Sequence, residues 1–286
     1  MDEDHGPNGD RANAARRLDQ ATRSTLRADL ARLGVRPDDL VMVHAGLRSI
    51  GPVVGGVNTV VQALLDAVGR NGTVAAYLDF EPGFEDDDDP AAIPVFDKRT
   101  ARAARDHGVL HETLRTWPGA LRSDHPDAGV MAIGARAEWI TAPHPFQYGY
   151  GEGTPFERIV VGGGRVLMLG APLDTITLLH HAEHKAALPD KRIHRYRRLM
   201  PGPDGPVWVA FEEFDTGDPV SARLPSDCFE RIARDHLAAG HGRQGTVGLA
   251  TSFLFDAAEL VAFGVRWLEG FPSGMSTRGG FRRPVD

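Results

Sequence analysis

Apolar and polar residues follow two different periods along the chain, and these predict strands and helices in alternation. Short continuous apolar runs predict buried strands over residues 40–44, 73–78, 128–133, 165–169 and 245–253. Apolar positions three or four residues apart predict amphipathic helices, the first of which carries Leu26, Leu30 and Leu33. Further helices are expected over residues 59–68, 108–117 and 154–161, around His180, after Ser226 and over residues 256–270.

Polar residues and glycines mark the ends of several of these elements. Thr22 or Ser24 is expected to cap the first helix, and Gly34 to end it. Asn58 is expected to cap the helix over residues 59–68.

Helices alternate with strands, and no linker divides them. We therefore expect one α/β domain over residues 21–271, folded as a three-layer α/β/α sandwich around a mixed sheet. Residues 193–213 predict a hairpin that turns at the Pro- and Gly-rich segment 201–206. The polar residues 1–20 and the last residues, 272–286, are expected to form flexible tails.

Composition narrows the possible classes of function. The chain has 286 residues and a net charge of −7, which argues against a nucleic-acid partner and suits a cationic ligand. Cys228 is the only cysteine, so no internal disulfide can form, and nothing around it marks an activated thiolate. No apolar run approaches the ~20 residues that span a bilayer, and the N-terminus lacks an apolar signal core. We expect a cytoplasmic protein without a membrane partner.

Titratable side chains concentrate at one junction between a buried strand and a helix. Asp174 is expected to cap this helix, and His180, Glu183 and His184 share one of its faces. Such junctions often hold the chemistry of α/β enzymes. Two interpretations stay open: a zinc site of the H-x-x-E-H type completed by a ligand such as Glu259, or His180 as a general base held by an acid.

A glycine-rich loop over residues 44–56 joins another buried strand to a helix. Glycines let backbone N–H groups approach an anion, and the positive end of a helix dipole favours negative charge. Arg48 and Ser49 add side-chain donors. The loop is either a pyrophosphate cradle or a tight turn that needs glycine for its backbone angles.

Carboxylates at strand ends are further candidates. Glu213 and Asp215 fall on one face of a strand end, where one could orient His180 and the other bind a cation. Asp79 and Glu81 directly follow the strand over residues 73–78, so the sheet would fix their positions. The acidic run over residues 85–89 is typical of a solvated loop.

Several segments together resemble the aminoglycoside 3-N-acetyltransferase family, in the family's order and spacing. Each segment alone is weak, but the ordered set is specific and covers residues 22–270. The segments are Val41–Gly56, Arg122–Pro126, Gly151–Pro155, Leu169–Glu183 and Glu213–Asp215.

The resemblance implies transfer of an acetyl group from acetyl-CoA to the 3-amine of the 2-deoxystreptamine ring of an aminoglycoside, without a metal. It also implies an α/β fold distinct from that of the GCN5-related acetyltransferases. His180 would be the base, supported by Glu213 and Asp215. The coenzyme A side would comprise Arg48, Ser49, Val54, Gly55, Gly56, Ser123, His125 and Thr175. The substrate side would comprise Asp79, Glu81, Glu152 and Asp174.

One departure and three alternatives accompany this resemblance. Many members carry a serine where this chain has Gly46, so a hydroxyl donor is missing from the loop. The alternatives are an acetyltransferase of the same family with another amine substrate, a zinc peptidase using His180, Glu183 and His184, and a non-catalytic coenzyme A-binding protein. The preferred aminoglycosides and the oligomeric state are left open.

Overall fold

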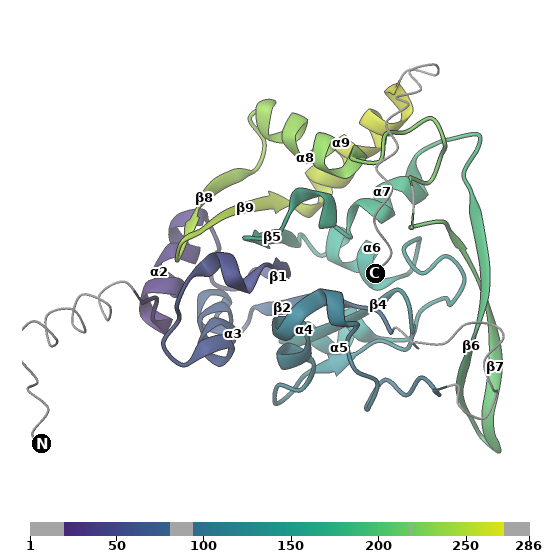
Figure 1. Ribbon diagram of the computed structural model, residues 1–286, viewed down its shortest axis with the longest axis horizontal. Coiled ribbons are helices and arrows are strands. Elements are labelled where there is room, and N and C mark those ends of the chain that lie inside the picture. Colours follow the sequence, from purple (N-terminus) through teal and green to yellow (C-terminus); the bar gives the residue numbers. More distant parts are fainter. Residues whose placement is uncertain (1–19, 81–93, 218, 272–286) are drawn as a thin grey trace, which may run out of the picture.

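The computed structural model describes residues 20–80, 94–217 and 219–271, and a mixed sheet forms the centre of this part (Figure 1). Its strand order is β3–β4–β2–β1–β5–β9–β8. The strands are β1 (Leu40–Ala45), β2 (Thr73–Leu78), β3 (Leu121–Arg122), β4 (Gly129–Gly134), β5 (Arg165–Leu169), β8 (Arg243–Val247) and β9 (Ala250–Asp256). Strands β2, β1 and β5 are parallel, and the strands outside them pair antiparallel.

Helices cover both faces of the sheet. Because side chains alternate along a strand, Val41 and Val43 pack into one core while Leu40 and Met42 pack into the other. The first core holds α2 (Arg23–Leu33), α3 (Gly56–Val68) and α4 (Gly108–Arg115). The second core holds α5 (Ala137–Thr141), α6 (Pro155–Val161), α7 (Leu179–Lys185), α8 (Cys228–Ala238) and α9 (Ala257–Gly270). The predicted three-layer sandwich with a mixed sheet is confirmed.

A long hairpin stands apart from the sheet, and it turns within the predicted segment 201–206 (Figure 1). Its strands are β6 (Ile193–Gly202) and β7 (Gly205–Phe214), paired antiparallel over their whole length. Met200 and Phe211 pack with Phe96 in a small third core, which fixes the hairpin to the domain.

Three predicted boundaries are wrong. Helix α3 begins at Gly56, with Gly55 as its N-cap, so Asn58 lies inside the helix instead of capping it. Asp174 lies in a short 3-10 helix, and α7 begins only at Leu179. The strand expected over residues 245–253 is two antiparallel strands, β8 and β9, joined at Gly248, whose φ of 58° places it in the left-handed region.

Some predictions concern residues that the structure does not describe. The predicted tails, apart from Gln20, lie outside the described residues, as do Glu81 and the acidic run over residues 85–89. Within the described part of the chain, no helix has the length and apolar character needed to cross a membrane.

Candidate active site

The three parallel strands end at the same edge of the sheet, and many of the candidate residues lie at or after these ends. His44 and Ala45 finish β1, Asp79 follows β2, and Gly170 follows β5. From Gly170 the chain passes through the 3-10 helix Leu173–Thr175 into α7. Ligands of α/β proteins bind at this carboxyl edge, because loops there can point functional groups into one crevice.

His180 and Glu183 form a hydrogen-bonded pair on α7. His180 Nδ1 lies 2.7 Å from Glu183 Oε2, and the residues are one helical turn apart. The Glu183 side chain is 4% exposed, and its second oxygen accepts a hydrogen bond from the Val220 backbone at 3.4 Å. A carboxylate only accepts, so Nδ1 carries the proton and Nε2 is the nitrogen that can take one from a substrate.

Aromatic rings hold the His180 imidazole in place. The Tyr150 ring lies 5.0 Å from it and the Phe229 ring 4.9 Å. The Tyr150 ring packs on Phe156 at 4.8 Å, and His181 Nδ1 hydrogen-bonds the Tyr150 carbonyl at 2.7 Å. The imidazole is therefore oriented by a buried acid and two rings while its side chain stays 18% exposed.

The expected supports of His180 have other partners. Glu213 Oε1 lies 2.7 Å from His184 Nε2, and Asp215 forms an ion pair with Arg192 at 3.7 Å. The prediction that Glu213 and Asp215 hold His180 is wrong in this respect, because β7 reaches α7 one helical turn further along. Glu213 Oε2 is buried and makes no hydrogen bond within the described residues.

Carboxylates surround two linked tyrosines beside the His180 pair. The Tyr77 and Tyr150 hydroxyls are 2.9 Å apart, and both hydroxyls lie within hydrogen-bond distance of the Asp127 carbonyl. Burial raises the pKa of Tyr150 well above its usual value, and the charges of Glu213, Asp79 and Asp127 raise it further. Glu213, Asp79 and Asp127 are therefore the carboxylates near the imidazole from which contacts to a cationic substrate would come.

Asp79 and Asp127 are both paired with basic groups. Asp79 hydrogen-bonds His107, whose ring lies edge-on to Tyr77 at 5.0 Å. Asp127 Oδ1 accepts hydrogen bonds from Arg198 at 2.6 and 3.0 Å. Burial raises the pKa of Asp127, and the Arg198 charge opposes that rise.

The glycine-rich loop meets the end of β5 through backbone contacts. Gly46 N donates to the Leu169 carbonyl at 3.0 Å, and a Cβ on Gly46 would lie 2.4 Å from the Gly170 carbonyl oxygen. Ser49 Oγ donates to the Gly46 carbonyl at 2.6 Å and lies 3.2 Å from the Gly170 carbonyl. Gly46 thus permits a close backbone approach in this chain, which a serine side chain would obstruct.

A groove of about 500 Å³ opens beside this contact. Ser49, Asp174, Glu230 and Arg234 are among its lining residues, together with Leu249 from the turn between β8 and β9. The groove combines a residue expected on the coenzyme A side with one expected on the substrate side. Arg234 is its basic group, paired with Glu230 at 2.6 Å.

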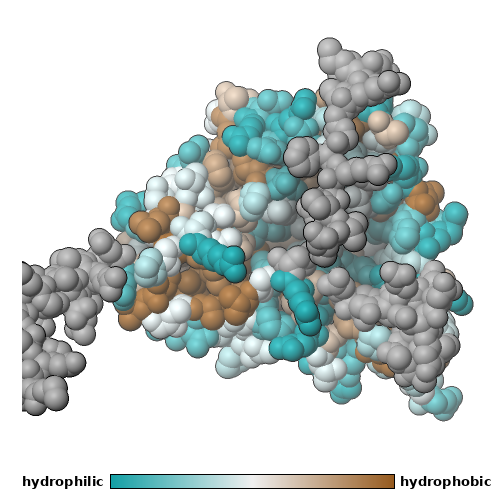
Figure 2. Space-filling model, in the orientation of Figure 1, coloured by the Kyte–Doolittle hydropathy of each residue, from teal (hydrophilic) through white to brown (hydrophobic). Residues whose placement is uncertain are grey.

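The N-terminus of α3 faces solvent. Gly55 and Gly56 have φ angles of 79° and 63°, and both are exposed, as are Arg48 and Val54. Figure 2 shows apolar surface gathered over α3 and bordered by hydrophilic side chains. An exposed helix start with glycines and an arginine nearby is suited to binding a phosphate, and the apolar surface beside it suits the less polar part of a cofactor.

Ser123 and His125 make internal contacts, although they were expected to line the coenzyme A side. Both are buried, and Ser123 Oγ accepts from the Val130 backbone at 3.0 Å. His125 Nδ1 accepts from the Ala128 backbone at 2.8 Å, and Nε2 lies 2.9 Å from the Phe146 carbonyl. Their side chains therefore hold the turn before β4 and are unavailable to a cofactor.

The remaining predicted residues fall into separate places. Thr175 and Glu152 are exposed, and Thr175 Oγ1 donates to the Pro172 carbonyl at 2.7 Å. The loop that carries Glu152 approaches His184, since a Cβ on Gly151 would lie 3.1 Å from His184 Nδ1.

Burial raises the pKa of Cys228 to about 12, which agrees with a structural cysteine.

The geometry also tests the zinc interpretation. Glu259 lies beside His241, at 3.8 Å, and not beside His180. The described residues hold no metal-like cluster of His180, Glu183 and His184, since Glu183 binds His180 while His184 turns to Glu213. The expectation that Glu259 completes a site on α7 is wrong.

Sequence reasoning missed Tyr150, Asp127 and two of the histidine–carboxylate pairings. Tyr150 and Asp127 had no local signal, because their roles arise from packing between distant segments. Glu183 as the partner of His180 was readable from the i, i+3 spacing, which was interpreted as part of a metal motif. The His184–Glu213 pair needed the hairpin to be placed in space.

The fold and the site define an α/β enzyme with a histidine–carboxylate pair at the carboxyl edge of its parallel strands. Residues 42–269 match the family model described as aminoglycoside 3-N-acetyltransferase. The chain belongs to this family.

Individual relatives agree with this assignment. Aminoglycoside N(3)-acetyltransferase III of Pseudomonas aeruginosa is 45% identical over 83% of this chain and 89% of its own length. The structure of AAC-IIIb in a binary complex with CoASH matches with a TM-score of 0.85 and 52% identity, over 88% of this chain and 99% of that one. The structure of AAC-VIa bound to sisomicin matches with a TM-score of 0.82 and 39% identity, over 87% and 98% of the two chains.

Proposed function

We propose that this protein transfers the acetyl group of acetyl-CoA to the 3-amino group of the 2-deoxystreptamine ring of aminoglycosides, and so confers resistance. The observation that carries the proposal is the His180–Glu183 pair beside the carboxylates that surround Tyr150. Family membership and relatives named for this activity support it. The relatives solved with CoASH and with sisomicin support the two substrates.

The chemistry requires a base, because an ammonium group has no lone pair with which to attack a thioester. His180 Nε2 takes the proton, and Glu183 stabilises the imidazolium that forms on the other ring nitrogen. The amine nitrogen then bonds to the acetyl carbonyl carbon, and the carbon–sulfur bond breaks. The attacking nitrogen loses a second proton as the amide forms. One of the two protons ends on the coenzyme A sulfur and the other passes to solvent, and the amide and the thiol then leave.

On the cofactor side, we assign the phosphates to the exposed start of α3. Arg48 supplies a charge-assisted contact, Ser49 lines the groove beside it, and the backbone of Val54, Gly55 and Gly56 supplies N–H donors. Thr175 is exposed and lies in the 3-10 helix that follows the end of β5. Ser123 and His125 are left out because they are buried and already bonded.

On the substrate side, we assign the ammonium groups to carboxylates near Tyr150. Glu213 has a buried oxygen without a partner among the described residues, and Asp79 lies at the end of β2. Glu152 lies on the loop next to His184. Asp174 lines the groove with Ser49, so we expect it to matter less for the aminoglycoside than Asp79 does.

Thiol release from acetyl-CoA across a panel of aminoglycosides tests the proposal. We expect release with 2-deoxystreptamine compounds, and two-dimensional NMR of the product should place the acetyl group on the 3-nitrogen. Release with other amines only would favour a different substrate within the family. Release with none would overturn the proposed activity.

Calorimetry with coenzyme A tests the cofactor side separately. Arg48→Ala should weaken binding by about 10- to 150-fold, since a hydrogen bond to a charged group contributes about 1.5–3 kcal/mol. Arg70→Ala is the matched control, because Arg70 is also exposed but follows the opposite end of α3. Equal affinities for the two variants would remove Arg48 from the site.

A further inference from the structure

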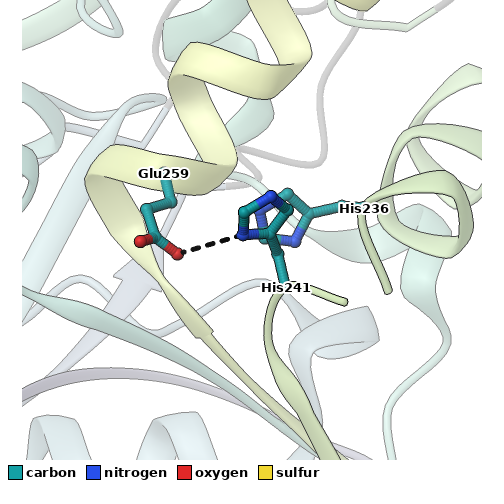
Figure 3. Close-up of side chains that lie close together, drawn as sticks. All are labelled: His236, His241 and Glu259. Carbon is teal, nitrogen blue, oxygen red and sulfur yellow. Dashed lines mark ion pairs between the residues drawn. The ribbon is translucent and has the colours of Figure 1, made fainter. Parts of the chain in front are cut away.

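A second histidine–carboxylate cluster lies where α8 ends and α9 begins (Figure 3). It comprises His236 in the last turn of α8, His241 beyond the helix end and Glu259 in the first turn of α9. One nitrogen of each histidine and one carboxylate oxygen all lie within 4.8 Å of one another.

Backbone geometry brings the two histidines together. Helix α8 ends in a Schellman motif: His241 N donates to the His236 carbonyl at 3.1 Å, and Gly240 N donates to the Leu237 carbonyl at 3.0 Å. Gly240 has the left-handed φ of 85° that this motif requires. The motif commonly places apolar side chains in contact at these two positions, and here it stacks two imidazoles with centroids 5.1 Å apart.

A second capping motif fixes the carboxylate. Asp256 caps α9 by accepting a hydrogen bond from Glu259 N at 3.0 Å, which places Glu259 at the third helical position. Glu259 Oε2 lies 3.8 Å from His241 Nδ1. All three side chains therefore project from helix ends whose geometry is set by backbone hydrogen bonds.

His236 supplies the independent sign that a ligand belongs here. Its side chain is fully buried, and neither ring nitrogen has a hydrogen-bond partner within the described residues. Leaving a buried polar atom without a partner destabilises the folded protein. A bound metal ion would give one of these nitrogens a partner.

We propose that His236, His241 and Glu259 bind one divalent zinc ion, with water completing a tetrahedral site. Two imidazoles and a carboxylate are a common zinc ligand set. Ligands about 2.0–2.1 Å from a tetrahedral ion lie about 3.3 Å apart, so the three atoms need to move closer only modestly. His241 and Glu259 are about half exposed, which gives the ion a path from solvent.

The local charges are compatible with this ion. Asp256 and Glu259 add negative charge near it, and Arg266 opposes them.

The ion would tie α8 to α9 and would not take part in acetyl transfer. His236 lies about 10 Å along α8 from Phe229, the residue that packs on His180, at 1.5 Å per residue. Zinc should therefore stabilise the second core without supplying a group to the reaction. The proposal does not depend on the proposed activity.

Metal analysis of the full chain, purified without a histidine tag, tests the site. We expect calorimetry with zinc alone to show one ion per chain, and cobalt in its place to give the visible absorption of a tetrahedral site. Zinc at 100 times its dissociation constant should raise the melting temperature by roughly 5–10 °C.

Matched variants decide whether these residues are the ligands. His241→Ala and Glu259→Gln change exposed side chains and should each weaken zinc binding at least 10-fold, whereas His194→Ala removes an exposed histidine from β6 and should not. Zinc affinity unchanged in both site variants, or absent from the parent chain, would overturn the proposal. Loss of acetyl transfer on chelation that zinc restores would overturn the structural role.

Discussion

Two histidine–carboxylate pairs lie one turn apart on α7, with the same separation of 2.7 Å between nitrogen and oxygen. His180 pairs with Glu183 on its own helix, while His184 pairs with Glu213 from the hairpin. The His180 side chain is 18% exposed, twice the 9% of His184. The first pair can therefore meet a substrate, whereas the second mainly anchors β7 to α7.

The origin of the acid explains this difference. A carboxylate three residues away on the same helix orients its histidine without closing the space in front of the ring. A carboxylate from another element brings the neighbouring residues of its own strand close to the histidine. Here the rings of Phe214 and Tyr148 pack against His184 at 4.6 and 5.7 Å. A histidine and a carboxylate thus form a base in the His180–Glu183 pair and a contact between α7 and β7 in the His184–Glu213 pair.

The largest expected effect separates the two histidines by activity. His180→Ala should lower kcat by about 10²–10⁴-fold, the range typical of losing a general base. His184→Ala should lower kcat far less but should lower the melting temperature more, because it breaks a buried pair. Steady-state kinetics and thermal unfolding of both variants measure the contrast.

Coenzyme A affinity is the control for these variants. It should be unchanged in His180→Ala, since the cofactor contacts are assigned to the start of α3. Near-parental turnover of His180→Ala, together with a large loss in His184→Ala, would reverse the roles of the two pairs.

The next effect concerns the acid of the exposed pair. Glu183→Gln keeps the shape of the side chain but removes the charge that stabilises the imidazolium. A hydrogen bond to a charged group is worth about 1.5–3 kcal/mol, so kcat should fall by roughly 10- to 150-fold. Asp215→Asn is the control, because Asp215 pairs with Arg192 and should leave kcat near the parental value. Equal losses in the two variants would restore Asp215 to the catalytic group.

The sequence predicts those features that depend on residues close together along the chain, and fails for those that depend on distant segments. The first helix and its cap, the strand over residues 73–78 and the hairpin follow from local periodicity and turn residues, and all were predicted correctly. The start of α7 was not, because a 3-10 turn without a side-chain cap intervenes between Asp174 and Leu179. Local sequence rules therefore predict the body of a helix better than the segment that leads into it.

The site divides in the same way. His180 could be singled out from its position after a buried strand, and Glu183 from its spacing. Whether Glu213 would reach His180 or His184 depended on how the hairpin docks, which no local pattern encodes. The family resemblance placed Ser123 and His125 on the coenzyme A side, but both are buried in a turn that only the fold reveals.

Histidines without an acid should respond to pH differently from these pairs. Burial lowers the pKa of His125 to about 3, from about 6.5 in an unfolded chain. Below pH 6.5 the unfolded chain therefore binds a proton that the folded protein does not. The free energy of unfolding should fall by about 1.4 kcal/mol per pH unit for this group as the pH drops from 6 toward 4.

Urea unfolding at several pH values measures that slope. His125→Gln should show a shallower dependence than the parent chain, by about one proton, even if the variant is less stable at pH 7. The difference between the two slopes isolates His125 from the carboxylates that titrate in the same range. Identical slopes would show that His125 is protonated in the folded protein.

The smallest expected effect tests whether the buried pair also touches the substrate. Glu213 gives one oxygen to His184 and has a second, buried oxygen without a partner among the described residues, close to Tyr150. An ammonium group of the aminoglycoside would satisfy that oxygen. Glu213→Gln preserves a hydrogen-bond acceptor for His184 but removes the charge. An ion pair between Glu213 and the ammonium group worth about 1 kcal/mol corresponds to roughly fivefold in affinity. The KM for the aminoglycoside should rise by that factor while the KM for acetyl-CoA stays constant. Glu212→Gln, on the other face of β7, is the matched control and should leave both constants unchanged. A fall in kcat without a change in either KM would instead mean that Glu213 acts on the base through His184.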